Sequence, residues 1–225
     1  MFAQEMVAGL HVIINDMKRY FRLKTVRLLD MPCGDMQWMS RFLQTRDDIN
    51  YTGIDIVSSV IDHHRVTYAR RPWTFRNVDI AADSTFVNNF HLILSRHMLQ
   101  HLENATVFNI LKKLSDNTRH PSFLLATKFS IDSKNVELKT HKLGRYRVLN
   151  LELAPFRLEP PLCLFRDGRI KPEIYAGLWR LPLTTIHESF CSQSKPANFL
   201  THLSTNKLYS CVAWGLPGSS RHLKT

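Results

Sequence analysis

Short apolar runs alternate with segments of helical periodicity over the first 130 residues, and this alternation constrains the fold more than any other feature of the chain. The apolar runs predict buried strands at residues 26–31, 51–57, 73–80, 90–95 and 122–130. Apolar side chains at three- and four-residue steps predict helices at residues 6–21, at residues 36–44, after Ser59 and after Asn104. Ser59 and Asp62 resemble a capping box at the start of the third helix. Strands that alternate with helices indicate an α/β, doubly wound fold, in which helices cover both faces of a mostly parallel sheet.

The C-terminal part of the chain gives weaker signals. Residues 148–153 and 177–181 are apolar enough for two further strands, and the proline-rich stretch between them is expected to be irregular because proline cannot donate to a strand ladder. Residues 187–225 hold ten Ser or Thr among 39 residues and show no sustained apolar period, although residues 209–216 could add a strand. We therefore expect one folded domain over residues 1–186 and an atypical, weakly folded or disordered tail over residues 187–225.

Net charge, the length of apolar runs and the cysteine spacing limit the classes of protein to which this chain can belong. The net charge is +11, and residues 134–225, with 14 Lys or Arg and 6 Asp or Glu, carry +8 of it. Such a region could attract a phosphate backbone or be a solvated surface, and both interpretations stay open. No apolar run approaches the ~20 residues that cross a bilayer. The chain start lacks a basic segment before its apolar stretch, and the four cysteines form no Cys-x-x-Cys pair, so we expect a reduced, cytoplasmic protein without a disulfide framework.

Acidic residues follow three of the predicted strands. Asp30 ends the first strand and precedes a turn with Gly34 and Asp35, Asp55 ends the second strand, and Asp79 follows the third. Because ligands of open α/β sheets bind outside the carboxyl ends of the strands, we expect these residues to face one ligand. A carboxylate after the second strand suits the two hydroxyls of a ribose. Acids beside the first turn suit a cationic amino-acid moiety and disfavour a pyrophosphate, so the pattern favours S-adenosylmethionine over NAD.

Five segments carry a family resemblance: LLDMPCGDMQWMS, YTGIDIV, FRNVDI, LILSRHMLQHL and LNLELAPF, in this order. The chain resembles, over roughly residues 5–183, the class I S-adenosylmethionine-dependent methyltransferases that have a D-x-P-C-G-D-x-x-W first motif. The resemblance implies a seven-stranded sheet with a C-terminal antiparallel hairpin made by residues 148–153 and 177–181. It also implies the cofactor S-adenosyl-L-methionine. The residues implied to hold it are Asp30, Pro32, Gly34, Asp35 and Trp38 at the methionine end, Asp55 and Ile56 at the ribose, Asp79 and Ile80 at the adenine, and Ser95 and Arg96 near the sulfonium.

The fourth motif departs from the family pattern at two positions, since Ser95 stands where the group has Cys and His97 where it has Asp. His97 is a candidate general base in the pocket. Asn150 and Glu152 lie two residues apart on a predicted strand, so they would share one face and are candidates to orient the methyl acceptor. Structural alternatives stay open: the acids after the first strand could cap a helix, Trp38 could be a core residue, and Asn150 and Glu152 could pair with a sheet neighbour.

His101 and Cys33 are residue types that can have chemical roles, but a structural role is the favoured interpretation for each. His97 and His101 are four residues apart, as metal ligands on a helix are, but the glutamate of H-E-x-x-H is missing, so we expect no metal site. We expect His101 to pack beneath the sheet. Cys33 has no adjacent base, so a small buried side chain is the favoured interpretation.

The sequence therefore predicts methyl transfer from S-adenosylmethionine to an unidentified acceptor. The alternative is a catalytically inactive protein of the same fold that binds nucleic acid through its basic C-terminal region. We expect no membrane partner, and the sequence leaves the oligomeric state open.

Overall fold

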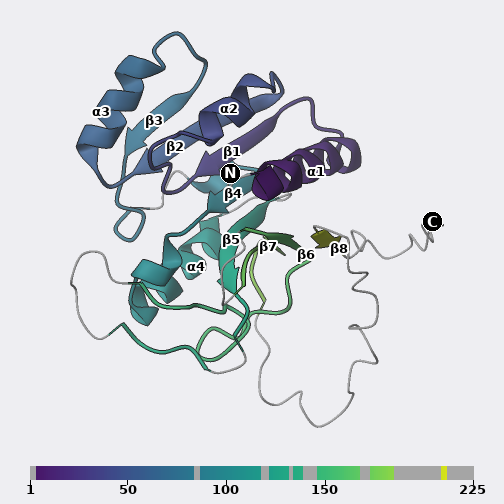
Figure 1. The fold of residues 1–225 in the computed structure, drawn as a ribbon, viewed down its shortest axis with the longest axis vertical. Helices are drawn as coiled ribbons and strands as arrows, with labels where there is room; N and C mark the ends of the chain where they lie inside the picture. The colour runs from purple at the N-terminus through teal and green to yellow at the C-terminus, as the bar shows by residue number, and fades with distance from the viewer. Residues whose placement is uncertain are drawn as a thin grey trace, which may run out of the picture.

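A sheet with helices on both faces forms the part of the chain that the structure describes. The computed structural model describes residues 4–83, 87–117, 122–131, 134–138, 146–167, 173–184 and 209–211. Its elements are α1 (Gln4–Phe21), β1 (Val26–Asp30), α2 (Met39–Gln44), β2 (Ile49–Asp55), α3 (Ser58–Thr67), β3 (Thr74–Asn77), η1 (Val87–Asn89), β4 (Leu92–Ser95), η2 (Leu99–His101), α4 (Asn104–Asn117), β5 (Phe123–Phe129), β6 (Cys163–Arg166), β7 (Ile174–Arg180) and β8 (Tyr209–Cys211), as labelled in Figure 1.

The sheet has the strand order β3-β2-β1-β4-β5-β7-β6-β8. Strands β1 to β5 run parallel to one another, whereas β7 runs antiparallel to both β5 and β6. The predicted α/β fold with seven strands and a terminal antiparallel hairpin is confirmed for β1 to β7. The short strand β8 adds an eighth, antiparallel to β6. The strand order reverses between β1 and β4, which is where ligands bind in open sheets of this kind.

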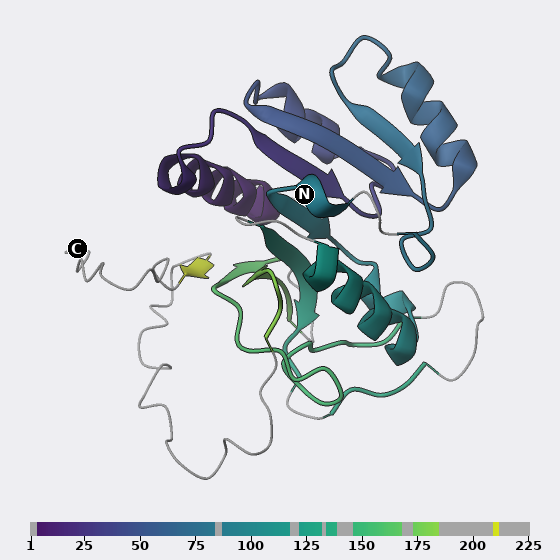
Figure 2. The ribbon, with the colours of Figure 1, turned by 180° about the vertical axis from the view of Figure 1, so that it is seen from behind.

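The two faces of the sheet have separate apolar cores. The stripe of α1, including Met6, Leu10 and Met17, packs with α2 and α3 against one face. Helix α4 packs against the other face through an apolar stripe that includes Ile110 and Leu114. Figures 1 and 2 show the helices on the two sides of the strands. Complete burial of one such side chain contributes about 1.5–3 kcal/mol, so these stripes hold the helices to the sheet and keep the strand ends in register.

The predicted strand at residues 148–153 is wrong. The side chain of Asn150 accepts the backbone N–H of Glu152 at 3.0 Å, and the side chain of Asn135 accepts the backbone N–H of Asn150 at 2.8 Å. These side chains take the hydrogen bonds that a strand ladder would need, so the segment turns instead. The hairpin partner of β7 is β6, which lies inside the stretch that was expected to be irregular.

Two smaller expectations also fail. Helix α3 begins two residues earlier than predicted, with Val57 at the N-cap, and no side chain makes a capping bond there, so Ser59 and Asp62 form no capping box. Cys163 is disulfide-bonded, against the expectation of reduced cysteines. Strand β8 falls within the predicted tail; the rest of residues 187–225 lies outside the described residues. Cys33 is buried and free, as expected. Among the described residues, none of the helices has the length and apolar character needed to cross a bilayer.

Candidate functional site

A cavity of about 280 Å³ opens at the carboxyl ends of β1, β2 and β3 and beneath the segment that follows β4. Most of the residues around it are apolar, with two carboxylates and two imidazoles among them. They are Met31, Pro32, Ile54, Asp55, Ile56, Val78, Asp79, Ile80, Ala81, His97, Met98, His101, Leu102 and Ile110. Apolar walls with a few polar groups are typical of small-molecule sites.

Asp55 ends β2 at the wall of this cavity and is only 8% exposed. Its Oδ1 accepts the backbone N–H of Val57 at 3.0 Å, and its Oδ2 accepts the backbone N–H of Gly34 at 3.2 Å. Each carboxylate oxygen has two lone pairs, so both oxygens retain the capacity to accept a further hydrogen bond from a ligand. Asp55 is therefore fixed in place and chemically able to bind a pair of hydroxyls.

The turn after β1 is held from two sides. Gly34 donates to Asp55, and its carbonyl lies 2.6 Å from Nε2 of His64 on α3, which must donate because a carbonyl can only accept. Gly34 has φ +52°, a conformation that favours glycine. A Cβ built on Gly34 would meet nothing within 4 Å. At this turn no side chain covers the backbone of Gly34, which faces open space beside the cavity.

Asp30, at the end of β1, lies beneath the turn and is 3% exposed. The hydroxyl of Tyr51 donates to its Oδ2 at 2.9 Å. Burial raises the pKa of Asp30 to about 7, with a further increase from the charge of Asp55, while the Tyr51 hydrogen bond and the charge of Arg96 oppose the shift. Near neutral pH, Asp30 is therefore present in both its neutral and its charged form. It lies on β1, the strand next to that of Asp55.

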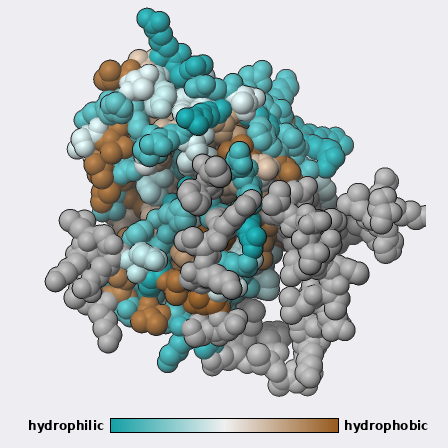
Figure 3. All heavy atoms as spheres, viewed as in Figure 1, coloured by the Kyte–Doolittle hydropathy of each residue, from teal (hydrophilic) through white to brown (hydrophobic). Residues whose placement is uncertain are grey.

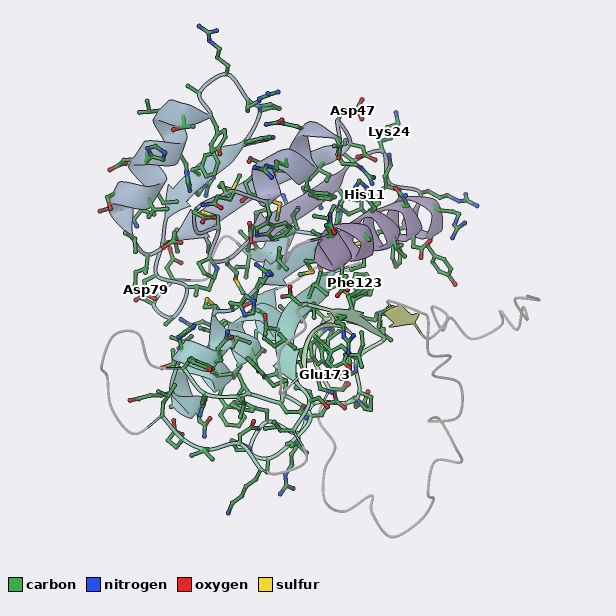
Figure 4. The ribbon with its side chains drawn as sticks, viewed as in Figure 1. His11, Lys24, Asp47, Asp79, Phe123 and Glu173 are labelled. Carbon is green, nitrogen blue, oxygen red and sulfur yellow. The ribbon has the colours of Figure 1, made fainter. Side chains whose placement is uncertain are left out.

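Asp79 and Ile80 lie on the loop after β3, on the wall of the same cavity as Asp55 and Ile56. Figure 4 places Asp79 at the left edge of the molecule, in the region between α3 and α4. Figure 3 shows hydrophobic residues gathered along this edge, and Ile56 is 65% exposed. Asp79 accepts the backbone N–H of Ala81 at 2.9 Å, which holds the loop in its turn.

A network of charged and aromatic side chains borders the cavity where β4 ends. Arg96 donates from Nε and Nη2 to the two oxygens of Asp167, at 2.8 and 2.9 Å, and lies over the ring of Trp38 at 5.4 Å. Nε2 of His97 lies 3.5 Å from Asp167, and Gln100 donates to Nδ1 of His97 at 3.1 Å. His97 reaches the cavity wall, whereas Arg96 and Trp38 lie behind it.

Four other predicted residues, Asp35, Ser95, Asn150 and Glu152, are not among the described residues that line the cavity. Asp35 is exposed and accepts the backbone N–H of Gln37 at 3.1 Å. Ser95 is fully buried at the end of β4, and its Oγ has no hydrogen-bond partner among the described residues. Asn150 shapes the turn described above, and Glu152 is ion-paired with Lys128 of β5.

The structure thus brings six of the predicted residues into one cavity: Pro32, Asp55, Ile56, Asp79, Ile80 and His97. His101, which was expected to pack beneath the sheet, is exposed and also lines the cavity, so that expectation is wrong. Sequence reasoning missed Tyr51, His64 and Asp167. Tyr51 begins the segment YTGIDIV, whereas His64 and Asp167 lie in no quoted motif, and for all three only the fold shows what the side chain contacts.

Comparisons with known proteins point to one fold. No family model matches the chain, and no curated protein matches its sequence. Solved structures do match. The N-methyltransferase NodS from Bradyrhizobium japonicum WM9 is 14% identical, with a TM-score of 0.56 over 80% of this chain and 97% of that one. The chain has the fold of the class I methyltransferases.

Two further structures agree. The Burkholderia thailandensis 1,6-didemethyltoxoflavin-N1-methyltransferase, solved with S-adenosylhomocysteine and 1,6-didemethyltoxoflavin, is 15% identical, with a TM-score of 0.55 over 80% of this chain and 88% of that one. The mitomycin 7-O-methyltransferase MmcR is 16% identical, with a TM-score of 0.56 over 78% of this chain and 53% of that one. The named proteins methylate at nitrogen and at oxygen, so the fold does not select the acceptor atom.

Proposed function

We propose that this protein binds S-adenosyl-L-methionine across the carboxyl ends of β1, β2 and β3 and transfers its methyl group to an acceptor. The observation that carries the proposal is Asp55, a fixed and buried carboxylate at the end of β2 that faces a mostly apolar cavity. The class I methyltransferase fold supports it. The neighbours' bound S-adenosylhomocysteine shows that this fold can hold the demethylated cofactor.

The cavity suits the adenosine half of the cofactor. Asp55 would accept the two ribose hydroxyls with the lone pairs that Val57 and Gly34 leave open. The apolar side chains of Ile56, Ile80 and Leu102 would contact the faces of the adenine ring. Asp79 would accept from the exocyclic amine of adenine.

The turn after β1 suits the methionine half. Gly34 leaves open space where a side chain would stand, so a ligand can approach the backbone closely. Asp35, together with Asp30 in its charged form, gives this end of the site a negative character that favours an ammonium group and a sulfonium. Trp38 and Arg96 lie together behind the turn, and Ser95 ends β4 beside them. These residues stay our candidates for the methionine end.

When bound, S-adenosylmethionine supplies an electrophilic methyl group on a positively charged sulfur. The residues of this chain would then act mainly by orientation, because in-line transfer needs donor and acceptor held in line. His97 has Gln100 and Asp167 at its two ring nitrogens, so it can take up an acceptor proton at Nδ1 only after the Gln100 amide turns away. Asn150 and Glu152 lie two residues apart in one turn and stay candidates for acceptor contact.

Calorimetric titration with S-adenosylhomocysteine tests the proposal directly. We expect binding by the full chain and a clear loss of affinity in Asp55→Ala. Failure of the unaltered protein to bind either S-adenosylmethionine or S-adenosylhomocysteine would refute it. If binding is found, incubation with methyl-labelled S-adenosylmethionine and a fractionated cell extract would identify the acceptor as the fraction that takes up label.

A further inference from the structure

A buried carboxylate from the C-terminal hairpin reaches the site. Asp167 directly follows β6, and its side chain is completely buried, with 0% exposed. Its backbone N–H donates to the carbonyl of Ile174 at 2.8 Å, so the start of β7 holds it in place. Its carboxylate accepts both donors of the Arg96 fork. Two parallel hydrogen bonds of this kind fix the position as well as the charge of an arginine.

The pairing fixes the segment that follows β4. Arg96 is held by Asp167 and by the ring of Trp38, and its side chain is only 18% exposed. His97 has φ +56°, a strained conformation for a residue with a side chain, and its backbone N–H donates to Oγ1 of Thr127 at 2.8 Å. Strain of this kind persists only where the surroundings determine the conformation. Asp167, which follows β6, and Thr127 of β5 provide those surroundings.

The ring of His97 is oriented by two neighbours. Gln100 donates to Nδ1, so the ring proton of the neutral form lies on Nε2 and faces Asp167 at 3.5 Å. The ring therefore presents a fixed face to the cavity, with 35% of its side chain exposed. The charged or titratable groups around it are Asp167, Arg96 and His101.

We propose that Asp167 is a positioning residue of the site, which fixes Arg96 and His97 at the cavity edge and makes the shape of that edge depend on the β6–β7 hairpin. This inference rests on the proposed function, because it assigns a role to a residue that lies behind the cavity. Removal of its charge would leave Arg96 partly buried without its partner and His97 without the group that its Nε2 faces. Both side chains would then lose their orientation.

The test combines a readout of His97 itself with a readout of the site. The ring titration of His97 is followed by NMR and assigned with His97→Gln. Burial lowers the pKa of His97, and the charge of Asp167 opposes that decrease. In Asp167→Asn we expect the titration midpoint to fall by about 1 pH unit, because an opposite charge nearby is lost. Asp167→Glu, which keeps the charge, should restore the midpoint.

Affinity for S-adenosylhomocysteine is the second readout. We expect Asp167→Asn to weaken it roughly 10-fold, which corresponds to about 1.4 kcal/mol. Arg96→Lys keeps the positive charge but cannot make the two parallel hydrogen bonds to Asp167. It should weaken S-adenosylhomocysteine binding while the titration midpoint of His97 stays near that of the unaltered protein. The matched control is Glu173→Gln, since Glu173 on the same hairpin is also paired with an arginine but that pair is 40% exposed. We expect Glu173→Gln to change neither readout.

The outcomes separate the two proposals. A folded Asp167→Asn protein with an unchanged His97 midpoint and unchanged affinity overturns the role of Asp167. If Asp167→Asn gives no cooperative melt, Arg96→Lys decides: weakened binding supports the role, and unchanged binding overturns it. If the unaltered protein binds no S-adenosylhomocysteine, the proposed function fails. The His97 midpoint in Asp167→Asn and Asp167→Glu then still decides whether Asp167 positions that ring.

Discussion

Gly34 donates its backbone N–H to Oδ2 of Asp55 at 3.2 Å, although the two residues are 21 positions apart in the chain. The turn after β1 and the carboxylate after β2 are therefore one structural unit. Since β1 and β2 are neighbouring parallel strands, the register of the sheet sets this distance. A ligand that contacts both residues binds a preformed surface, which lowers the entropic cost of binding.

Asp55→Ala removes the carboxylate that we assign to the ribose. We expect affinity for S-adenosylhomocysteine to fall by about 1–3 kcal/mol, the range for hydrogen bonds to a charged acceptor. Isothermal titration calorimetry measures the effect. Asp62→Ala is the control, because Asp62 is an exposed acid on α3 that pairs only with Arg65 among the contacts described. Equal affinities of Asp55→Ala and the unaltered protein would remove Asp55 from the site.

Gly34→Ala places a methyl group where the structure has open space. The left-handed conformation costs a residue with a side chain about 1–2 kcal/mol, so we expect a modest decrease in stability without a clash. We expect a larger effect on S-adenosylhomocysteine affinity, because the methyl group would occupy the approach to the turn. The control is Gly177→Ala on β7, whose Cβ would collide with the ring of Trp179 and should reduce stability while binding is retained. Normal binding by Gly34→Ala would contradict this assignment.

His64→Ala removes the side chain that holds the carbonyl of Gly34. His64 is 3% exposed and packs against the ring of Phe75 at 5.2 Å. We expect the free energy of unfolding to fall by roughly 1–3 kcal/mol, because a buried hydrogen-bonding group loses its partner. Urea denaturation measures the change. The neighbouring His63 is exposed, so His63→Ala should stay within about 0.5 kcal/mol of the unaltered protein. Equal losses in both variants would speak against the role of His64.

Asp30→Asn tests the raised pKa of that carboxyl. With a pKa of about 7 in the folded protein, Asp30 retains a proton that the unfolded chain releases near its ordinary value of 3.8. Its contribution to stability is therefore complete below about pH 4 and is lost as the pH rises to about 7. The stability of Asp30→Asn relative to the unaltered protein should rise over this range. Urea unfolding at a series of pH values gives this difference.

His91 is the main competing group in that experiment. Burial lowers its pKa to about 4, so its contribution to stability is present above about pH 6.5 and is lost as the pH falls toward 4. This trend is opposite to that of Asp30, but it is common to both proteins and cancels in their difference. A difference that does not vary with pH would contradict the shift at Asp30.

The sequence predicted β1, β2, β4 and β5 because each is mostly buried and therefore appears as an apolar run. Strand β3 was also predicted, although only Phe75 of its four residues is buried. The sequence also predicted that Asp55 and Asp79 would share a site, because both follow parallel strands of one sheet. It failed at residues 148–153, where Asn135 and Asn150 bond to the backbone and override an apolar pattern. One of these bonds spans 15 positions and the other two, and neither leaves a periodic signal in the sequence.

Strand β6 and Asp167 were missed for related reasons. Strand β6 has four residues, as β3 and β4 have, but it lies in a proline-rich stretch that was expected to be irregular. Asp167 is 71 positions from Arg96, and a single acid in a loop gives no indication of such a partner. The elements with local patterns could be predicted, whereas the support of the site depends on contacts that only the folded chain makes.

The same separation has a consequence for biosynthesis. Arg96 leaves the ribosome 71 residues before Asp167 does, and β7, which inserts between β5 and β6, emerges later still. In a nascent chain, strands β1 to β5 can therefore pair before Asp167, the partner of Arg96, has been synthesised. The last strands to be translated therefore complete the sheet, and a polypeptide that ended before them would hold the cavity-lining ends of β1, β2 and β3 without the carboxylate that pairs with Arg96.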